Sequence, residues 1–156
     1  MPQPIVYPHR IAENCIPQIG SFRPDGFCNE EWKMVAETQK ILHEPDLAIT
    51  ATTIRVPSMV GHGESVYIET EDRIGADEAR RILADSPGVV LWDDDQGGRV
   101  PYPTPLDCAG RDPVYVGRIR DDLYVPTGLN MWVVADNLRK GAALNAVQIA
   151  ELLLPE

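Results

Sequence analysis

The chain has 156 residues, of which 44% are hydrophobic, and its 14 basic and 24 acidic residues give a formal net charge of −10. This length and hydrophobic content predict one globular domain with a sizeable core and exclude a disordered chain. The negative charge repels nucleic-acid phosphates and anionic lipid surfaces, so we expect neither as a partner. No apolar run approaches the roughly 18 residues of a membrane span, and the first residues lack the features of a secretory signal.

The three cysteines, Cys15, Cys28 and Cys108, are odd in number, widely spaced and without a C-x-x-C pair. This pattern indicates neither a disulfide framework nor a zinc site, and we expect no metal centre. None of the three lies in an electropositive sequence context, so buried and inert thiols are predicted. A reducing cytoplasm is the compartment that such cysteine usage favours.

The predicted elements begin after a proline-rich stretch. Five prolines within residues 2–24 exclude a helix there and indicate extended segments and turns. Residues 29–42 are then predicted as a helix, with Asn29 as its cap and Glu30 and Glu31 near the positive end of its dipole. Its apolar stripe consists of Trp32, Val35 and Ala36 and is widened by Met34, Ile41 and Leu42.

Alternation and β-branched residues predict strands over 47–60 with a break near Pro57, and over 64–70, 89–92, 114–120 and 129–135. A glycine-flanked corner at residues 61–63 joins the first two strands. A short helix is predicted over 77–85, and Asp136 is expected to cap a final helix that extends to about residue 153. Together these elements predict an α+β fold with a mostly antiparallel or mixed sheet and helices on one face.

An arginine and a histidine seven residues apart, Arg55 and His62, are the first candidates for chemistry. A guanidinium fork pairs bidentately with a carboxylate, as an ammonium group cannot. Histidine titrates near neutral pH and can therefore exchange a proton during turnover. The alternative is that Arg55 pairs with a surface acid and that His62 is an ordinary turn residue.

The second candidate pair is Glu30 and Lys33, which share a face of the predicted helix because they lie three residues apart. Lys33 can hold a phosphate as a point charge, and Glu30 can hold an ammonium group. The alternative is a solvated ion pair worth a few tenths of a kcal/mol. The final helix has apolar residues on most sides, so it requires cover from more than one direction, or it packs simply on its own domain.

Other features of the sequence do not indicate a functional site. Asp93, Asp94 and Asp95 are expected to form a solvated turn, because a calcium loop needs a later acid at a fixed spacing. The sequence contains no glycine-rich phosphate-binding loop. His9 and His43 have no partner at a meaningful spacing and are expected at the surface.

Several blocks match one known family in order along the chain. They are Asn14-Cys15-Ile16-Pro17-Gln18-Ile19, Glu30-Glu31-Trp32-Lys33, Glu37-Thr38-Gln39-Lys40-Ile41-Leu42, Arg55-Val56-Pro57 with Gly61-His62, Val116-Gly117-Arg118-Ile119-Arg120, and Asp136-Asn137-Leu138-Arg139-Lys140-Gly141-Ala142-Ala143. With these blocks the chain resembles the carboxy-terminal half of aspartate-semialdehyde dehydrogenase. The block that contains Arg55 and His62 is the most specific.

The resemblance implies a fold similar to the second domain of glyceraldehyde-3-phosphate-dehydrogenase-like enzymes. It also implies reduction of L-aspartyl-4-phosphate to L-aspartate 4-semialdehyde with NADPH, on the route to lysine, threonine and methionine. In that family a cysteine nucleophile forms a thioacyl intermediate. By this resemblance, His62 is the catalytic acid/base, Arg55 and Glu30 bind the substrate, Lys33 binds phosphate, and Asn137 contacts NADP.

Members of that family are longer, and their amino-terminal half holds the dinucleotide loop, the nucleophilic cysteine and a substrate-binding glutamine. Cys15 and Gln18 do not replace these groups, because their motif matches another part of the family. We expect residues 1–135 to form a substrate-binding and dimerisation domain. Residues 136–156 are expected to form a terminal helix that packs, in the family, on the absent NADP-binding domain, which binds most of the cofactor.

The resemblance leads to three further expectations. The chain alone should not catalyse the reaction, because the covalent nucleophile is missing. Its last helix should be exposed, swapped or disordered, and the chain should form a homodimer. Two residues depart from the family. Gly63 stands where the family usually has a small hydroxyl residue, and Thr53 stands where it often has a cysteine. The alternatives are a fragment similar to N-acetyl-gamma-glutamyl-phosphate reductase and a non-catalytic self-association module.

Overall fold

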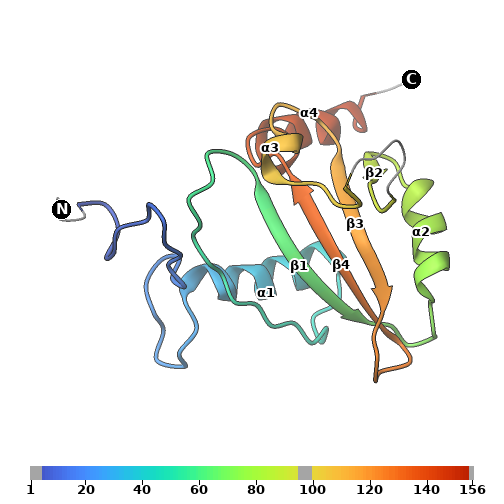
Figure 1. Cartoon of the computed structure of the whole chain (residues 1–156), viewed down its shortest axis with the longest axis horizontal. Coiled ribbons are helices and arrows are strands. Elements are labelled where there is room, and N and C mark those ends of the chain that lie inside the picture. The colour runs from blue at the N-terminus through green and yellow to red at the C-terminus, as the bar shows by residue number, and fades with distance from the viewer. Residues whose placement is uncertain (1–4, 95–99, 155–156) are drawn as a thin grey trace. The chain divides into compact units, whose positions relative to one another are not determined.

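The computed structural model describes residues 5–94 and 100–154, which divide into two compact units at residues 57 and 58 (Figure 1). The division follows Pro57, where the predicted break in the first strand also lies. Each unit has its own secondary structure. No helix among the described residues is both long and apolar enough to cross a lipid bilayer.

The first unit consists of irregular backbone and one helix, α1 (Asn29–Leu42). The prediction of a strand over 47–60 is wrong, because among these residues only Arg55 forms a β-bridge, to Ile16. The β-branched run has no neighbouring strand, and a side chain satisfies part of its backbone. The N–H of Thr53, for example, donates to the carboxylate of Glu31 at 2.9 Å. Strand propensity without a partner strand does not make a sheet.

Helix α1 has the predicted bounds but a different cap. Cys28 precedes the helix in extended backbone, with φ −87° and ψ 162°, so Asn29 is already helical and does not cap it. The Glu31 carboxylate reaches back to the Cys28 N–H at 2.8 Å, which satisfies one of the free donors of the first turn. Glu31 is also the one buried residue of the helix, whereas Trp32 is 46% exposed and Ile41 73% exposed.

The second unit is built on a four-stranded sheet with the order β1-β4-β3-β2 (Figure 1). The strands are β1 (His62–Glu69), β2 (Val89–Leu91), β3 (Val114–Asp121) and β4 (Gly128–Ala135). β4 pairs antiparallel with both β1 and β3, while β2 pairs parallel with β3. The α+β fold with a mixed sheet is thus confirmed. β1 already begins at His62, so this histidine lies at the start of a strand rather than in a corner.

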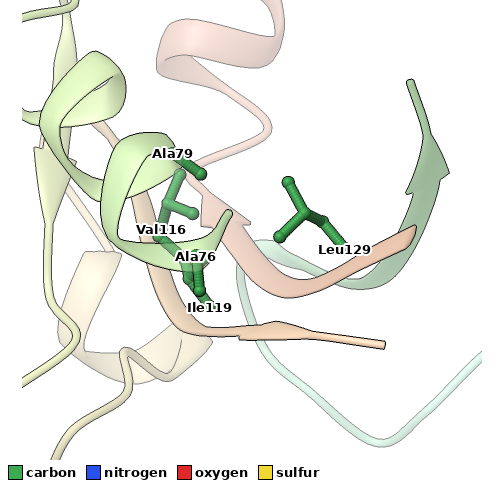
Figure 2. Close-up of a cluster of buried hydrophobic side chains, with 5 residues drawn as sticks. All are labelled: Ala76, Ala79, Val116, Ile119 and Leu129. Carbon is green, nitrogen blue, oxygen red and sulfur yellow. The ribbon is translucent and has the colours of Figure 1, made fainter. Parts of the chain in front are cut away.

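Helix α2 (Ala76–Ala84) covers one face of the sheet and buries the main core. Figure 2 shows this cluster of buried side chains, which is formed by Ala76, Ala79, Val116, Ile119 and Leu129. The two alanines face the sheet, and their small side chains let the helix backbone approach the β3 side chains closely. Each of these five residues is at most 7% exposed. The amphipathic pattern that predicted a helix over 77–85 is therefore confirmed by its packing.

Asp93 is not part of a solvated turn, which corrects the prediction. Its side chain is only 6% exposed and pairs with the Nε of Arg80 at 2.7 Å. The other carboxylate oxygen accepts the Ile119 N–H at 3.0 Å. The carboxylate joins α2 to the bulged part of β3, a role that the run of three acids did not reveal. Residues 95–98 of the predicted turn lie outside the described residues.

The opposite face carries a second cluster, formed by Trp92, Cys108, Tyr115 and Val134 with Trp132 packed against it. Successive strand residues point to opposite faces, so Tyr115 faces this cluster while Val116 faces α2. The short helix α3 (Pro105–Cys108) contributes Cys108. This helix lies where a proline-rich loop was predicted. Thr104 caps it and Pro105 starts it, a combination that the three nearby prolines obscured.

The carboxy-terminal segment is helical but not one regular helix. A π-helical turn, η2 (Arg139–Ala143), precedes α4 (Leu144–Glu151). None of the described α4 residues is buried, and Val147 and Ile149 are each 54% exposed. This exposure agrees with the expectation that the last helix is exposed.

Candidate functional site

The β1–β4 pairing brings two predicted site residues together in the second unit. His62 pairs with Ala135 in the sheet register, and Asn137 follows two residues later. The Asn137 amide lies between the two chain segments. Its Oδ1 accepts the Gly61 N–H at 3.2 Å, and its Nδ2 is 3.5 Å from Nε2 of His62. Residues that are 75 positions apart in the sequence thus meet at one end of the sheet.

The backbone at Gly61 fixes the direction of that N–H group. Gly61 has a φ of +84°, a conformation that other residues rarely adopt. A side chain here would also lie 3.2 Å from both the Ala135 carbonyl oxygen and the Cβ of Pro105. The glycine is therefore required by conformation and by close approach.

Asp136 anchors the other side of the contact. It is 4% exposed, and its carboxylate accepts the N–H groups of Gly110 at 2.7 Å, Leu138 at 2.8 Å and Arg139 at 3.2 Å. These backbone hydrogen bonds, that of Gly110 above all, lower the pKa of Asp136. The N-cap residues of η2 and α4 are Leu138 and Ala143, without a side-chain cap, so the prediction that Asp136 caps the final helix is wrong. Its carboxylate instead holds the turn before η2 that carries Asn137.

Gly63 leaves room for an indole ring beside His62. A Cβ at this position would lie 2.6 Å from Cζ2 of Trp132, so any side chain must displace the ring. The indole is held in turn, because its Nε1–H donates to the Pro103 carbonyl at 2.9 Å. The glycine that stands in place of a small hydroxyl residue therefore has a steric partner within this chain.

Arg55, Glu30 and Lys33 belong to the first unit. The Arg55 backbone makes two hydrogen bonds with Ile16, at 3.0 and 2.9 Å, and its guanidinium lies 5.1 Å from the centre of the Tyr7 ring. Among the residues that the structure describes, no carboxylate pairs with Arg55. The alternative of a surface ion pair for this arginine is therefore not realised within those residues.

Lys33 and Glu30 form the expected ion pair along α1, with Nζ 3.2 Å from Oε2. Both side chains are substantially exposed, at 54% for Lys33 and 40% for Glu30. An exposed pair of this kind contributes about 0–1 kcal/mol, so a ligand can replace either partner at little cost.

Glu31 has a structural role that the sequence analysis, which placed it only near the positive end of the helix dipole, did not predict. Its carboxylate accepts two backbone N–H groups, from Cys28 and from Thr53, and these hydrogen bonds lower its pKa. They join the start of α1, which carries Glu30, to the segment that leads to Arg55. Beside them the Thr53 hydroxyl lies 3.2 Å from the Cys28 thiol. A glutamate at the third position of a predicted helix was the available signal.

Glu31→Gln is expected to destabilise the chain at neutral pH and to flatten its loss of stability on acidification. The folded-state pKa of Glu31 is depressed, so its contribution is present above the unfolded glutamate pKa of about 4.3 and is lost as the pH falls through the folded value. Urea midpoints measured from neutral pH downward test this expectation. Glu37→Gln, an exposed site on the same helix, is the matched control, and equal slopes for both variants would argue against the assignment.

The three cysteines divide into one exposed and two buried thiols. The prediction of burial is wrong for Cys15, because its neighbour Ile16 occupies the buried position of the bridge to Arg55. Burial, and then the nearby Asp107, raise the pKa of Cys108 to about 11, which keeps this thiol protonated. His9 and His43 are exposed as predicted.

Two hollows lie in the described part of the chain, and neither contains a predicted site residue. One of about 440 Å³ in the first unit is lined by Phe22, Phe27 and Glu31 among others, and one of about 270 Å³ in the second unit by Tyr102, Arg118 and Trp132 among others. None of the predicted site residues lines either hollow. Within residues 5–94 and 100–154, no three metal-ligating side chains come together.

The mixed sheet and its flanking helices define an α+β domain, with His62 at the start of its edge strand. A family model described as the dimerisation domain of semialdehyde dehydrogenases matches residues 1–140. The chain therefore belongs to this family, and it corresponds to the carboxy-terminal part of aspartate-semialdehyde dehydrogenases.

Relatives and solved structures agree with this family. The aspartate-semialdehyde dehydrogenase of Aquifex aeolicus is 51% identical over 156 residues, which are 100% of this chain and 45% of the relative. That of Bacillus subtilis is 49% identical over 146 residues, 93% of this chain and 42% of the relative. The crystal structure of aspartate semialdehyde dehydrogenase II from Vibrio cholerae, complexed with ASA, has a TM-score of 0.91 and 45% identity, and the match covers 97% of this chain and 44% of that one. The chain thus spans less than half the length of these proteins.

Proposed function

We propose that the chain is the substrate-binding and dimerisation half of an NADP-dependent aspartate-semialdehyde dehydrogenase. The reaction would be the reduction of L-aspartyl-4-phosphate to L-aspartate 4-semialdehyde with release of phosphate, in lysine, threonine and methionine biosynthesis. The observation that carries this proposal is the 51% identity along the whole chain to one such enzyme. Residues 1–135 would form the substrate domain, and residues 136–156 would pack on the part that binds NADP.

Arg55 is assigned to the carboxylate of the substrate. Its guanidinium has no carboxylate partner among the described residues, and its backbone is fixed by Ile16. In a chain with a net charge of −10, a guanidinium without an acid beside it is available to a small anion. The Tyr7 ring forms a cation–π contact with this guanidinium.

Lys33 is assigned to the phosphate and Glu30 to the substrate. The Lys33 ammonium is held only by an exposed ion pair, which a doubly charged phosphate can replace because the attraction is stronger. Glu30 would then be free to bind the ammonium group of the same substrate. Glu31 keeps this first turn of α1 in place without taking part in binding.

His62 is assigned as the general acid/base, and Asn137 as a contact to NADP. When bound, NADPH supplies the hydride. The Asn137 amide fits such a contact, because Oδ1 is engaged by Gly61 while Nδ2 carries two hydrogens and only one can point to His62. The imidazole is exposed at the start of β1, where a reacting group can reach it.

A homodimer in the cytoplasm is proposed for the chain. The match to a dimerisation-domain family supports self-association, and all three cysteines are free, as a reducing compartment requires. The same match is the observation that favours a non-catalytic self-association module as the second candidate function. Sedimentation of the purified chain would show whether it has twice the mass of a monomer.

The test is to join the chain to the amino-terminal part of the Aquifex aeolicus relative and to measure NADP- and phosphate-dependent oxidation of aspartate semialdehyde. We expect activity from the joined protein and none from the chain alone, because the proposal assigns the covalent nucleophile to the amino-terminal part. The intact relative is the positive control. Turnover by the chain alone above that of its His62→Ala variant would contradict the proposal, and so would a folded but inactive joined protein.

A further inference from the structure

We propose that Asn137 is a positioning residue that fixes the tautomer of His62. In this tautomer the proton is on Nδ1, and Nε2 keeps its lone pair. The inference rests on the proposed role of His62 as acid/base, but the tautomer itself can be measured without any activity. It concerns the contact between the Asn137 amide and the His62 ring rather than the contact of Asn137 with a cofactor.

The argument starts from the orientation of the amide. The Gly61 N–H can only donate, so the Asn137 atom that lies 3.2 Å from it must be the oxygen. The nitrogen of the same amide then faces Nε2 of His62, at 3.5 Å. An amide nitrogen can only donate, so Nε2 must be the acceptor. A neutral imidazole that accepts at Nε2 carries its proton on Nδ1.

The Gly61 N–H group and the Asn137 amide are both held by rigid backbone. Gly61 has positive φ and is packed against the Ala135 carbonyl and Pro105. Asn137 follows Asp136, whose buried carboxylate accepts three N–H groups. The amide therefore cannot exchange its oxygen and nitrogen without leaving the Gly61 N–H unpaired.

In this tautomer, Nε2 is the ring nitrogen that can accept a proton. A general base must direct a lone pair toward the proton that it accepts. The Asn137 amide keeps Nε2 unprotonated and faces the same side of the ring. A reacting group takes the place of the Asn137 N–H at this single lone pair, which the long contact of 3.5 Å permits. It transfers its proton to Nε2 and gives an imidazolium, which returns that proton from Nε2 in the reverse step, after which the Asn137 N–H occupies the lone pair again. Nδ1 keeps its own proton throughout.

The inference is tested by ¹⁵N NMR of the uniformly labelled chain at a pH at which the ring is neutral, with the His62 signals assigned by their loss in His62→Gln. Two-bond ¹H–¹⁵N correlations distinguish the two tautomers. We expect His62 to be mainly in the Nδ1–H form, while the exposed His9 and His43 show the Nε2–H form that free imidazole side chains favour. Asn137→Ala and Asn137→Asp should both shift His62 to the Nε2–H form.

Asn137→Asp is the sharper variant, because its carboxylate still accepts the Gly61 N–H and keeps the fold while it offers Nε2 only an acceptor. An Nε2–H tautomer in the unsubstituted chain, or an unchanged tautomer in Asn137→Asp, would overturn the inference. In the joined protein, Asn137→Asp should lower kcat more than it raises KM for aspartate semialdehyde. An inactive joined protein with the Nδ1–H tautomer would refute the proposed function and leave the positioning contact standing.

Discussion

Replacement of Gly117 by alanine is expected to lower the free energy of unfolding by about 3 kcal/mol or more, at the upper end of the range for an overpacked interior. A Cβ at this position would lie 2.2 Å from the carbonyl oxygen of Trp92 and 3.0 Å from Cδ of Pro103. Neither atom can rotate away. The oxygen belongs to the backbone, and the Cδ belongs to a proline ring that is bonded to its own backbone nitrogen. The Trp92 segment is also tied to β3 by the hydrogen bond from its N–H to the Val116 carbonyl, at 2.7 Å.

Thermal unfolding measures this effect, and Gly141→Ala is the matched control. A Cβ on Gly141 would lie 3.6 Å from its nearest neighbours, which is ordinary contact, and its φ is not positive. Alanine there is expected to leave stability unchanged or to raise it by up to about 1 kcal/mol. A loss of about 3 kcal/mol corresponds to a fall in Tm of roughly 6–12 °C for a chain of this size. Equal Tm values for the two variants would contradict the packing described around Gly117.

His62→Asn is expected to lower kcat of the joined enzyme by about 10²–10⁴-fold, the usual contribution of general acid–base catalysis. The amide that replaces the imidazole can form hydrogen bonds but cannot exchange a proton at neutral pH. His62 is exposed, so the substitution is not expected to unfold the sheet. Steady-state oxidation of aspartate semialdehyde with saturating NADP and phosphate measures the effect.

His43→Asn is the control for this loss. His43 ends α1 with a φ of 57°, in the left-handed region that asparagine adopts more readily than most residues. The same chemical change is therefore made at an exposed histidine without a proposed role, and it should leave kcat within a factor of about two. A similar loss in both variants would show that the imidazole of His62 has no special part in the reaction.

The sequence predicted elements well where local pattern and packing agree. Helix α2 and strands β3 and β4 lie within about a residue of their expected bounds, because each has one apolar face that the other elements cover. The run 47–60 has equally strong strand propensity, but a strand also needs a partner, which propensity cannot specify. Helix α3 was missed since its four residues are too few to show a helical period.

The sequence proposed candidate residues for a site, and of their contacts it predicted only the ion pair between Glu30 and Lys33. The spacing of Arg55 and His62 identified two groups with suitable chemistry, and the resemblance to a known family added Asn137. The contact between Asn137 and His62 depends on the register that pairs His62 with Ala135, which no local pattern reports. The steric partnership of Gly63 with Trp132 likewise follows from tertiary packing and not from the glycine itself.

A crystal structure of the joined protein soaked with aspartate semialdehyde would test the central claim most directly. We predict that the guanidinium of Arg55 holds the substrate carboxylate bidentately. A ligand whose carboxylate is bound away from Arg55 would contradict the assignment.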